Sequence, residues 1–222
     1  MISESFMHFV EYELQAIALT WMVVIYTFKA IRLSKLPMPW EKETEKGNAS
    51  KGVLYSYASI FMPWSVESSR DHIWRWIGFA LYHVGCLVAI VNTFTFTFTP
   101  KLMTPSVKII FSILIAPALV VGFSKFIRRI VRPEIRHIST PDDYFSLLSL
   151  QLFFFTGIMA LLMGSSLFWR SSYYVVTAAF LFYVPFSKIS HYIYFFFARF
   201  LTGKRYGWRG IIPKISKHES SK

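Results

Sequence analysis

Five long apolar blocks, separated by polar or basic segments, run along the chain. Each is long enough to form a transmembrane helix, which needs about 20 predominantly apolar residues to cross the hydrocarbon core of a membrane. The blocks cover residues 14–31, 73–98, 107–127, 144–168 and 173–198. The pattern predicts an all-α fold, an integral membrane bundle of five transmembrane helices that forms a single membrane domain over residues 1–222.

The end of the second block alternates threonine and phenylalanine from Thr93 to Thr99, as a β-strand would. A lone strand cannot pair its backbone groups inside lipid, so we expect the helix to continue through this stretch. Threonine hydroxyls can bond back to the preceding helical turn, and Pro100 then ends the helix.

Basic residues gather on one side of the predicted membrane. They occur in residues 32–72, in the turn between the third and fourth blocks, and in the tail 199–222, whereas only Lys101, Lys108 and Arg170 fall on the opposite side. The positive-inside rule then places the N-terminus outside and the C-terminus in the cytoplasm. We therefore expect a multi-pass protein of the cell inner (cytoplasmic) membrane.

Residues 32–72 form the expected cytoplasmic loop, which includes the aromatic run VLYSYASIFMPW. This run is compatible with an amphipathic stretch along the interface, with a docking site for a soluble subunit, or with a loop resting on lipid headgroups.

Composition supports the membrane class, because 54% of the 222 residues are hydrophobic and only 16% are charged. The net charge of +12 does not indicate a nucleic-acid partner, since the basic residues flank apolar blocks rather than line one soluble surface. Cys86 is the sole cysteine of the sequence, which excludes a disulfide framework or a CxxC motif. The N-terminus has acids and no basic residue before the first block, so we expect that block to remain in the mature protein.

Two histidines, His83 and His191, lie well inside predicted spans. Counted from the cytoplasmic ends of their helices, they are about 10 Å and about 12 Å deep. Imidazoles on two helices at one depth can supply both axial ligands of a haem iron. A histidine at this depth can also be a hydrogen-bonded packing residue, and both interpretations stay open on the residues alone.

The segment YVPFSKISHYIYFFFARFLTGKRYGWRG, together with LYHVG, TPKLMTPSVK and RRIVRPEIRHISTPDDYFSLLSL, carries a family resemblance over about residues 75–210. It resembles the membrane haem b (gamma) subunit of respiratory nitrate reductases, with its relatives in heterodisulfide reductases and dissimilatory sulfite-reduction membrane complexes. The resemblance implies that His83 and His191 ligate the iron of one haem b.

Family members commonly hold a second haem nearer the outside. By spacing, its ligand positions fall at about Thr93 and Tyr173, neither of which is a histidine. In one continuous helix Tyr173 would lie on the face of His191, eighteen residues later. We therefore expect one haem, with the space near Thr93, Tyr173 and Lys108 open to a carrier headgroup. The resemblance associates a lysine at the position of Lys108 with quinol, whereas by itself Lys108 is equally compatible with a snorkelling lysine.

Two further basic residues are candidates for the haem propionates. Lys188 lies one turn before His191 and either reaches a propionate or snorkels to the inner surface, and Arg75 lies at the inner mouth of the second helix. Asp142 and Asp143 are predicted to stabilise the start of the fourth helix, which begins at Ser139 or Thr140.

The resemblance implies a membrane cytochrome b subunit that transfers electrons between a quinone-type carrier (menaquinol, ubiquinol or methanophenazine) and a cytoplasmic iron–sulfur subunit. The partner would be heterodisulfide reductase-like or nitrate reductase beta-like, and the chain would be an electron-transfer subunit of a quinone-linked oxidoreductase, not catalytic alone. The alternative is a haem-free structural anchor. The lack of helices broken at Gly or Pro argues against a further alternative, a small transporter.

Overall fold

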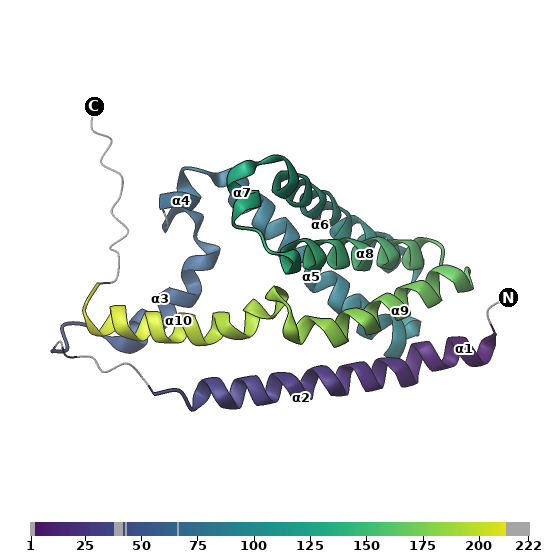
Figure 1. Cartoon of the computed structure of the whole chain (residues 1–222), viewed down its shortest axis with the longest axis horizontal. Helices are drawn as coiled ribbons and strands as arrows, with labels where there is room; N and C mark the ends of the chain where they lie inside the picture. The colour runs from purple at the N-terminus through teal and green to yellow at the C-terminus, as the bar shows by residue number, and fades with distance from the viewer. Residues whose placement is uncertain (1–2, 38–41, 43, 66, 212–222) are drawn as a thin grey trace. The chain divides into compact units, whose positions relative to one another are not determined.

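The computed structural model describes residues 3–37, 42, 44–65 and 67–211. These residues form helices and turns and contain no β-strand (Figure 1), so the all-α prediction is confirmed for the part of the chain that is described. The elements are, in order, α1 (Glu4–His8), the π-helical turn η1 (Phe9–Glu13), α2 (Leu14–Ser34), α3 (Ala49–Ala58), η2 (Ser59–Phe61), η3 (Pro63–Ser65), α4 (Glu67–Arg70), α5 (Ile73–Phe98), η4 (Pro100–Leu102), α6 (Pro105–Val131), α7 (Pro133–His137), α8 (Pro141–Leu162), α9 (Leu167–Tyr183), η5 (Val184–Phe186), η6 (Lys188–Ser190) and α10 (His191–Trp208).

Four helical segments among the described residues have the length and apolar composition needed to cross a membrane. They are Glu4–Ser34, Ile73–Phe98, Pro105–Val131 and Pro141–Leu162. They correspond to the first four predicted blocks and make the chain a multi-pass membrane protein by length and composition.

The second block is one helix, α5, with the predicted bounds. The hydroxyls of Thr95, Thr97 and Thr99 each donate to the carbonyl four residues earlier, at 3.0 to 3.2 Å. The helix ends at Phe98, and Pro100 begins a 3-10 turn. The helical interpretation of the Thr and Phe alternation is confirmed.

The fifth block, 173–198, is not one helix, and this prediction was wrong. Two 3-10 turns, η5 and η6, separate α9 from α10. Pro185 has no N–H and cannot continue an α-helical ladder. Beyond it the N–H groups of Lys188 and Ile189 donate to side chains, to Asp142 Oδ2 at 2.9 Å and to Ser187 Oγ at 3.1 Å. Side-chain acceptors therefore replace the carbonyls of a continuous helix.

The break has two consequences for the sequence-based argument. Tyr173 belongs to α9 and His191 begins α10, so eighteen residues do not complete five turns of one helix between them. The argument against a transporter, which rested on the lack of a helix broken at proline, no longer holds on that ground. The fourth block is also shorter than predicted, since α8 ends at Leu162 and a turn leads into α9.

The contacts divide the chain into two compact units, Met1–Phe28 with Gly78–Ser190 and Lys29–Ile77 with His191–Lys222. In the first unit α8 packs against α6 and α9, and η1 packs against α9. A Cβ added at Gly85 of α5 would lie 2.2 Å from the Cβ of Ala118, so this glycine lets α5 approach α6 closely. The core is aromatic at its centre, with Phe154, Tyr173 and Tyr174 almost fully buried.

In the second unit α3 and α10 pack against each other in antiparallel fashion. The start of α3 lies at the end of α10, where the N–H groups of Lys46 and Gly47 donate to the Trp208 carbonyl at 2.9 and 3.1 Å. At the other end, Tyr57 donates to the Phe196 carbonyl at 2.7 Å. Gly210, with φ of +71°, then ends the helix in the left-handed conformation that favours glycine.

Candidate functional site

His83 projects from the apolar helix α5, where a backbone carbonyl contacts one nitrogen of its imidazole. Its Nδ1 lies 2.8 Å from the carbonyl oxygen of Phe79. Because a carbonyl only accepts hydrogen bonds, Nδ1 carries a proton, and in the neutral ring the lone pair is then on Nε2. A metal-ligating histidine commonly has this tautomer, held by a backbone carbonyl. The ring of Phe79 packs against the imidazole at 4.1 Å between centroids and limits its rotation.

His191 is the first residue of α10 and follows directly on the turn η6. The chain from His191 through Arg199 is helical, as the depth estimate assumed. Both histidine side chains are exposed in the protein. They belong to different compact units, His83 to the first and His191 to the second. No cluster of three or more His, Cys, Asp or Glu side chains able to hold a metal ion occurs in the described residues.

Thr93 and Tyr173 are brought together in the first unit. The Thr93 hydroxyl lies 2.7 Å from the Tyr173 hydroxyl, and Asn92 Nδ2 donates to the same oxygen at 3.1 Å. Tyr173 is only 1% exposed, and its ring stacks on Phe153 and meets Phe96 edge-on. The phenol therefore fills the space that was expected to be open beside Thr93.

Lys108, in the first turn of α6, lies beside a different part of α8 from this pair. A Cβ added at Gly164, just beyond the end of α8, would lie 3.5 Å from Lys108 Nζ, whereas a Cβ added at Gly157 would meet the Tyr173 ring at 3.3 Å. Gly157 lies inside α8, whereas Gly164 lies in the turn two residues beyond its end at Leu162. The residues predicted to line the carrier site therefore do not form one group. Thr93 and Tyr173 form a buried pair, and Lys108 is a half-buried lysine beside the end of α8.

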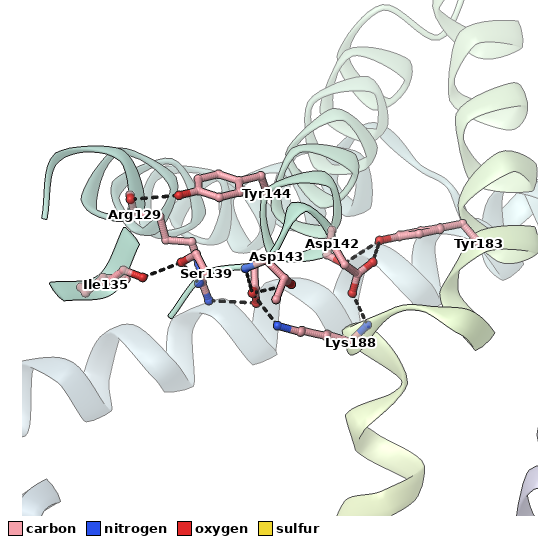
Figure 2. A network of polar contacts seen from close by, with 10 residues as sticks. Arg129, Ile135, Ser139, Asp142, Asp143, Tyr144, Tyr183 and Lys188 are labelled. Atoms are coloured by element: carbon pink, nitrogen blue, oxygen red, sulfur yellow. Dashed lines mark hydrogen bonds and ion pairs between the residues drawn. The ribbon is translucent and has the colours of Figure 1, made fainter. Parts of the chain in front are cut away.

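A network of polar contacts joins α6, α8, α9 and η6 (Figure 2). The Lys188 ammonium bonds to one oxygen of Asp143, and Arg129 Nη2 lies 3.4 Å from the other. Asp142 accepts from the Tyr183 hydroxyl and from the backbone N–H of Lys188. The Lys188 ammonium, a candidate partner of a haem propionate, thus has a carboxylate of the chain itself as a partner.

Asp143 also stabilises the start of α8, as predicted. Thr140 is the N-cap residue, and Asp143 Oδ2 accepts from the Thr140 N–H at 2.8 Å and from its hydroxyl at 2.9 Å. The capping role of Asp143 is therefore confirmed, although the sequence did not indicate its two basic partners. Arg75, the other propionate candidate, is an exposed residue in the first turn of α5.

The structure also shows a polar group that the sequence analysis missed, at the π-helical turn η1. Glu11 pairs with Arg170 at 3.1 Å and accepts from the Tyr174 hydroxyl at 3.0 Å. Gln15, one turn later, donates to the Tyr174 carbonyl at 2.8 Å. An acid and an amide four residues apart inside an apolar helix are the signal that was available, because ionisable groups at such positions require partners.

Comparisons with known proteins give one relative without a functional description. A protein of Nitratidesulfovibrio vulgaris strain Hildenborough, described only as "Protein", is 26% identical over 165 residues, which cover 70% of this chain and 72% of that protein. No family model matches the chain, and no solved structure matches it.

Proposed function

We propose that this chain is a membrane cytochrome b subunit with one bis-histidine haem b, ligated by His83 and His191. The observation that carries the proposal is the hydrogen bond of His83 Nδ1 to the Phe79 carbonyl, which leaves Nε2 as the acceptor nitrogen of the neutral ring. The resemblance of the LYHVG and PFSKISH segments to the nitrate reductase gamma family supports the same pair. Both imidazoles are exposed side chains on helices, as axial ligands of an inserted cofactor would be.

In this function the chain binds and orients, and a bound haem supplies reversible one-electron transfer. Electrons pass between a quinone-type membrane carrier and a cytoplasmic iron–sulfur subunit, which is heterodisulfide reductase-like or nitrate reductase beta-like. The Phe79 carbonyl keeps His83 in the ligating tautomer, and the Phe79 ring limits its rotation. The chain is an electron-transfer subunit of an oxidoreductase and is not catalytic alone.

The arrangement in the cytoplasmic membrane that we propose has the N-terminus outside and the C-terminus inside. The basic residues of the 32–72 segment and of α10 support a cytoplasmic position for both. An outside N-terminus and an inside C-terminus require an odd number of crossings. The fifth crossing is then the broken segment from α9 to α10, in addition to the four apolar helices.

A haem count of one is supported by the contact of Thr93 with Tyr173. These residues occupy the positions at which relatives would carry a second ligand pair, and here they bond to each other in a packed core. Lys108, in the first turn of α6 and beside the end of α8, remains the residue that we assign to the carrier headgroup. Lys108→Gln is expected to slow quinol-dependent haem reduction, and unchanged reduction would remove Lys108 from the carrier site.

The test is the haem content of the purified full-length protein. We expect a reduced b-type spectrum with about one haem per chain, lost in His83→Ala and in His191→Ala. His137→Ala is the matched control, because His137 is an exposed histidine of α7 and is expected to leave the spectrum unchanged. Two haems per chain would contradict the count.

The alternative is a haem-free membrane anchor of a redox complex. One observation favours it, namely that the Lys188 ammonium bonds to Asp143, a carboxylate of the chain itself, where a propionate was expected. Protein made in haem-replete cells that carries no b-type spectrum would establish this alternative and overturn the cytochrome proposal.

A further inference from the structure

A pocket of about 280 Å³ lies between α3 and α10 in the second unit. The two helices approach closely because Gly52 and Gly203 have no side chains at the crossing, where an added Cβ would meet the facing backbone at 2.1 and 2.7 Å. Six side chains supply the polar lining of the pocket: Tyr55, Ser56, Ser59, Arg199, Thr202 and Tyr206.

The polar side chains of the lining have the chemistry of an oxyanion site, although most of the pocket surface is apolar. It combines one guanidinium with five hydroxyl groups, and none of the residues that line it is acidic. A guanidinium offers a planar fork of N–H donors that matches two phosphate oxygens, and hydroxyls can donate to the others. The Ser59 hydroxyl is not one of these donors, because it donates to the Ser56 carbonyl at 3.0 Å. The Arg199 guanidinium lies over the Phe195 ring, 5.4 Å from its centroid, and this contact restricts its orientation.

The surroundings of the pocket favour a lipid as the source of the phosphate. Large apolar side chains of the same unit are exposed, among them Leu54 at 71%, Phe61 at 77% and Phe196 at 57%. Aromatic and basic side chains together are typical of the headgroup level of a membrane, and Lys204 and Arg205 continue the basic character of α10. Basic pockets between helices at this level bind the headgroups of anionic lipids.

We propose that the α3–α10 pocket binds the phosphate group of an anionic phospholipid, with the Arg199 guanidinium as its main contact and the hydroxyls of Thr202 and Tyr55 as further donors. The inference does not depend on the haem, because none of the residues involved is a proposed ligand. It assigns to the second unit the role of a lipid-binding platform. Inorganic phosphate shares the recognised chemistry and is the alternative source.

The experiment measures retained lipid on the full-length protein by native mass spectrometry. Detergent-solubilised protein is titrated with phosphatidylglycerol, with phosphatidylcholine as the zwitterionic comparison and with millimolar inorganic phosphate in a separate arm. Arg199→Gln is expected to weaken phosphatidylglycerol binding by about tenfold or more, since it removes a charge-assisted contact. Lys204→Gln removes the same charge from an exposed position of the same helix outside the pocket and is expected to change binding less than about twofold.

Thr202→Val provides a second variant, because it removes a hydroxyl from an exposed position without changing charge or volume greatly. We expect a reduction of severalfold with unchanged helicity and elution volume. If inorganic phosphate displaces the lipid from the wild-type protein but not from Arg199→Gln, the result supports the phosphate site. It would also show that the phosphate group alone is sufficient for binding there. Equal losses with Arg199→Gln and Lys204→Gln would show diffuse attraction instead of a site. Those losses, or full retention of lipid by Arg199→Gln, would overturn the proposal.

Discussion

Asp143 caps the start of α8 and also contacts two basic side chains, one of which belongs to η6. Its two oxygens accept from Thr140, contact Lys188 and face Arg129 (Figure 2). The sequence predicts the first role, because an acid in the first turn after Thr140 is a local signal. The other two depend on residues at a distance along the chain, Lys188 being 45 positions away. A single sequence contains no local pattern that joins them.

Asp143→Asn is expected to destabilise the protein by about 1–2 kcal/mol, because it leaves two cations without their shared carboxylate while partial exposure of Lys188 screens the loss. The apparent Tm in detergent should fall by a few degrees. Glu134→Gln is the control, since the Arg132–Glu134 pair is about 65% exposed and is expected to contribute almost nothing. Equal shifts for the two variants would contradict the role assigned to Asp143.

Tyr173 gives the second prediction at this scale. Tyr173→Phe removes the oxygen that accepts from Asn92, which is 1% exposed, and so leaves a buried amide without this partner. We expect a loss of about 1–3 kcal/mol in stability. Tyr12→Phe, at an exposed tyrosine of η1, should leave the apparent Tm unchanged.

The same variant separates packing from carrier binding. If Tyr173 lined a carrier site, Tyr173→Phe would lower quinol-dependent haem reduction without lowering the apparent Tm. The buried position of the ring predicts the opposite, a lower Tm with little change in the reduction rate at a temperature where the protein remains folded.

At the scale of elements, the apolar pattern predicted helices well where one helix continues through lipid. The bounds of α5 agree with the apolar block because the threonine hydroxyls bond within the helix and Pro100 ends it. The prediction of one helix for the fifth block, 173–198, was wrong for a physical reason. Apolar residues continue through Val184 and Phe186, so hydropathy does not change, while Pro185 and the side-chain acceptors Asp142 and Ser187 end the helical ladder.

The pairing of α3 with α10 was also not predicted, although a signal for it was present. Gly203 and Gly207 are four residues apart, the spacing of small residues with which helices approach closely, and they face Gly52. The hydropathy pattern predicts a loop where α3 lies and a basic tail after residue 198, and neither expectation suggests that the two segments pair. The tail from residue 212 lies outside the described residues.

Gly203→Ala tests this packing. The added Cβ would lie 2.7 Å from the Gly52 carbonyl oxygen and from Val53 Cα, which are backbone atoms, so the two helices must move apart. We expect a cost of about 1–3 kcal/mol. Trypsin cleavage after Lys51, an exposed lysine of α3, should become faster, and the apparent Tm should fall.

Gly78→Ala is the matched control for this variant. A Cβ at Gly78 would find its nearest neighbour, a Val121 methyl group, at 3.9 Å, and alanine favours the helix by about 0.5–1 kcal/mol. We expect an unchanged or slightly higher apparent Tm. A similar decrease for both variants would indicate that loss of glycine flexibility, and not helix contact, causes the effect.

For the whole molecule, the number of membrane crossings determines on which side of the membrane each terminus lies. Four crossings would place both ends on one side of the membrane, and five would place them on opposite sides. The four apolar helices do not include the segment from α9 to α10. The location of α10 therefore tests whether this broken segment crosses.

We expect opposite sides, and single cysteines in a Cys86→Ser background test it with a membrane-impermeant maleimide. Ser5→Cys, in the exposed first turn of α1, should react in intact spheroplasts, whereas Lys204→Cys in α10 should react only after lysis. Lys51→Cys reports the segment between the first two spans and should also require lysis, whichever count is correct. Because the lysine and arginine residues of α10 belong on the cytoplasmic side by the positive-inside rule, reaction of Lys204→Cys in intact spheroplasts would show that the α9–α10 segment returns without crossing. His191 would then lie in a re-entrant segment, and the bis-histidine proposal would need a ligand other than a residue of a fifth span.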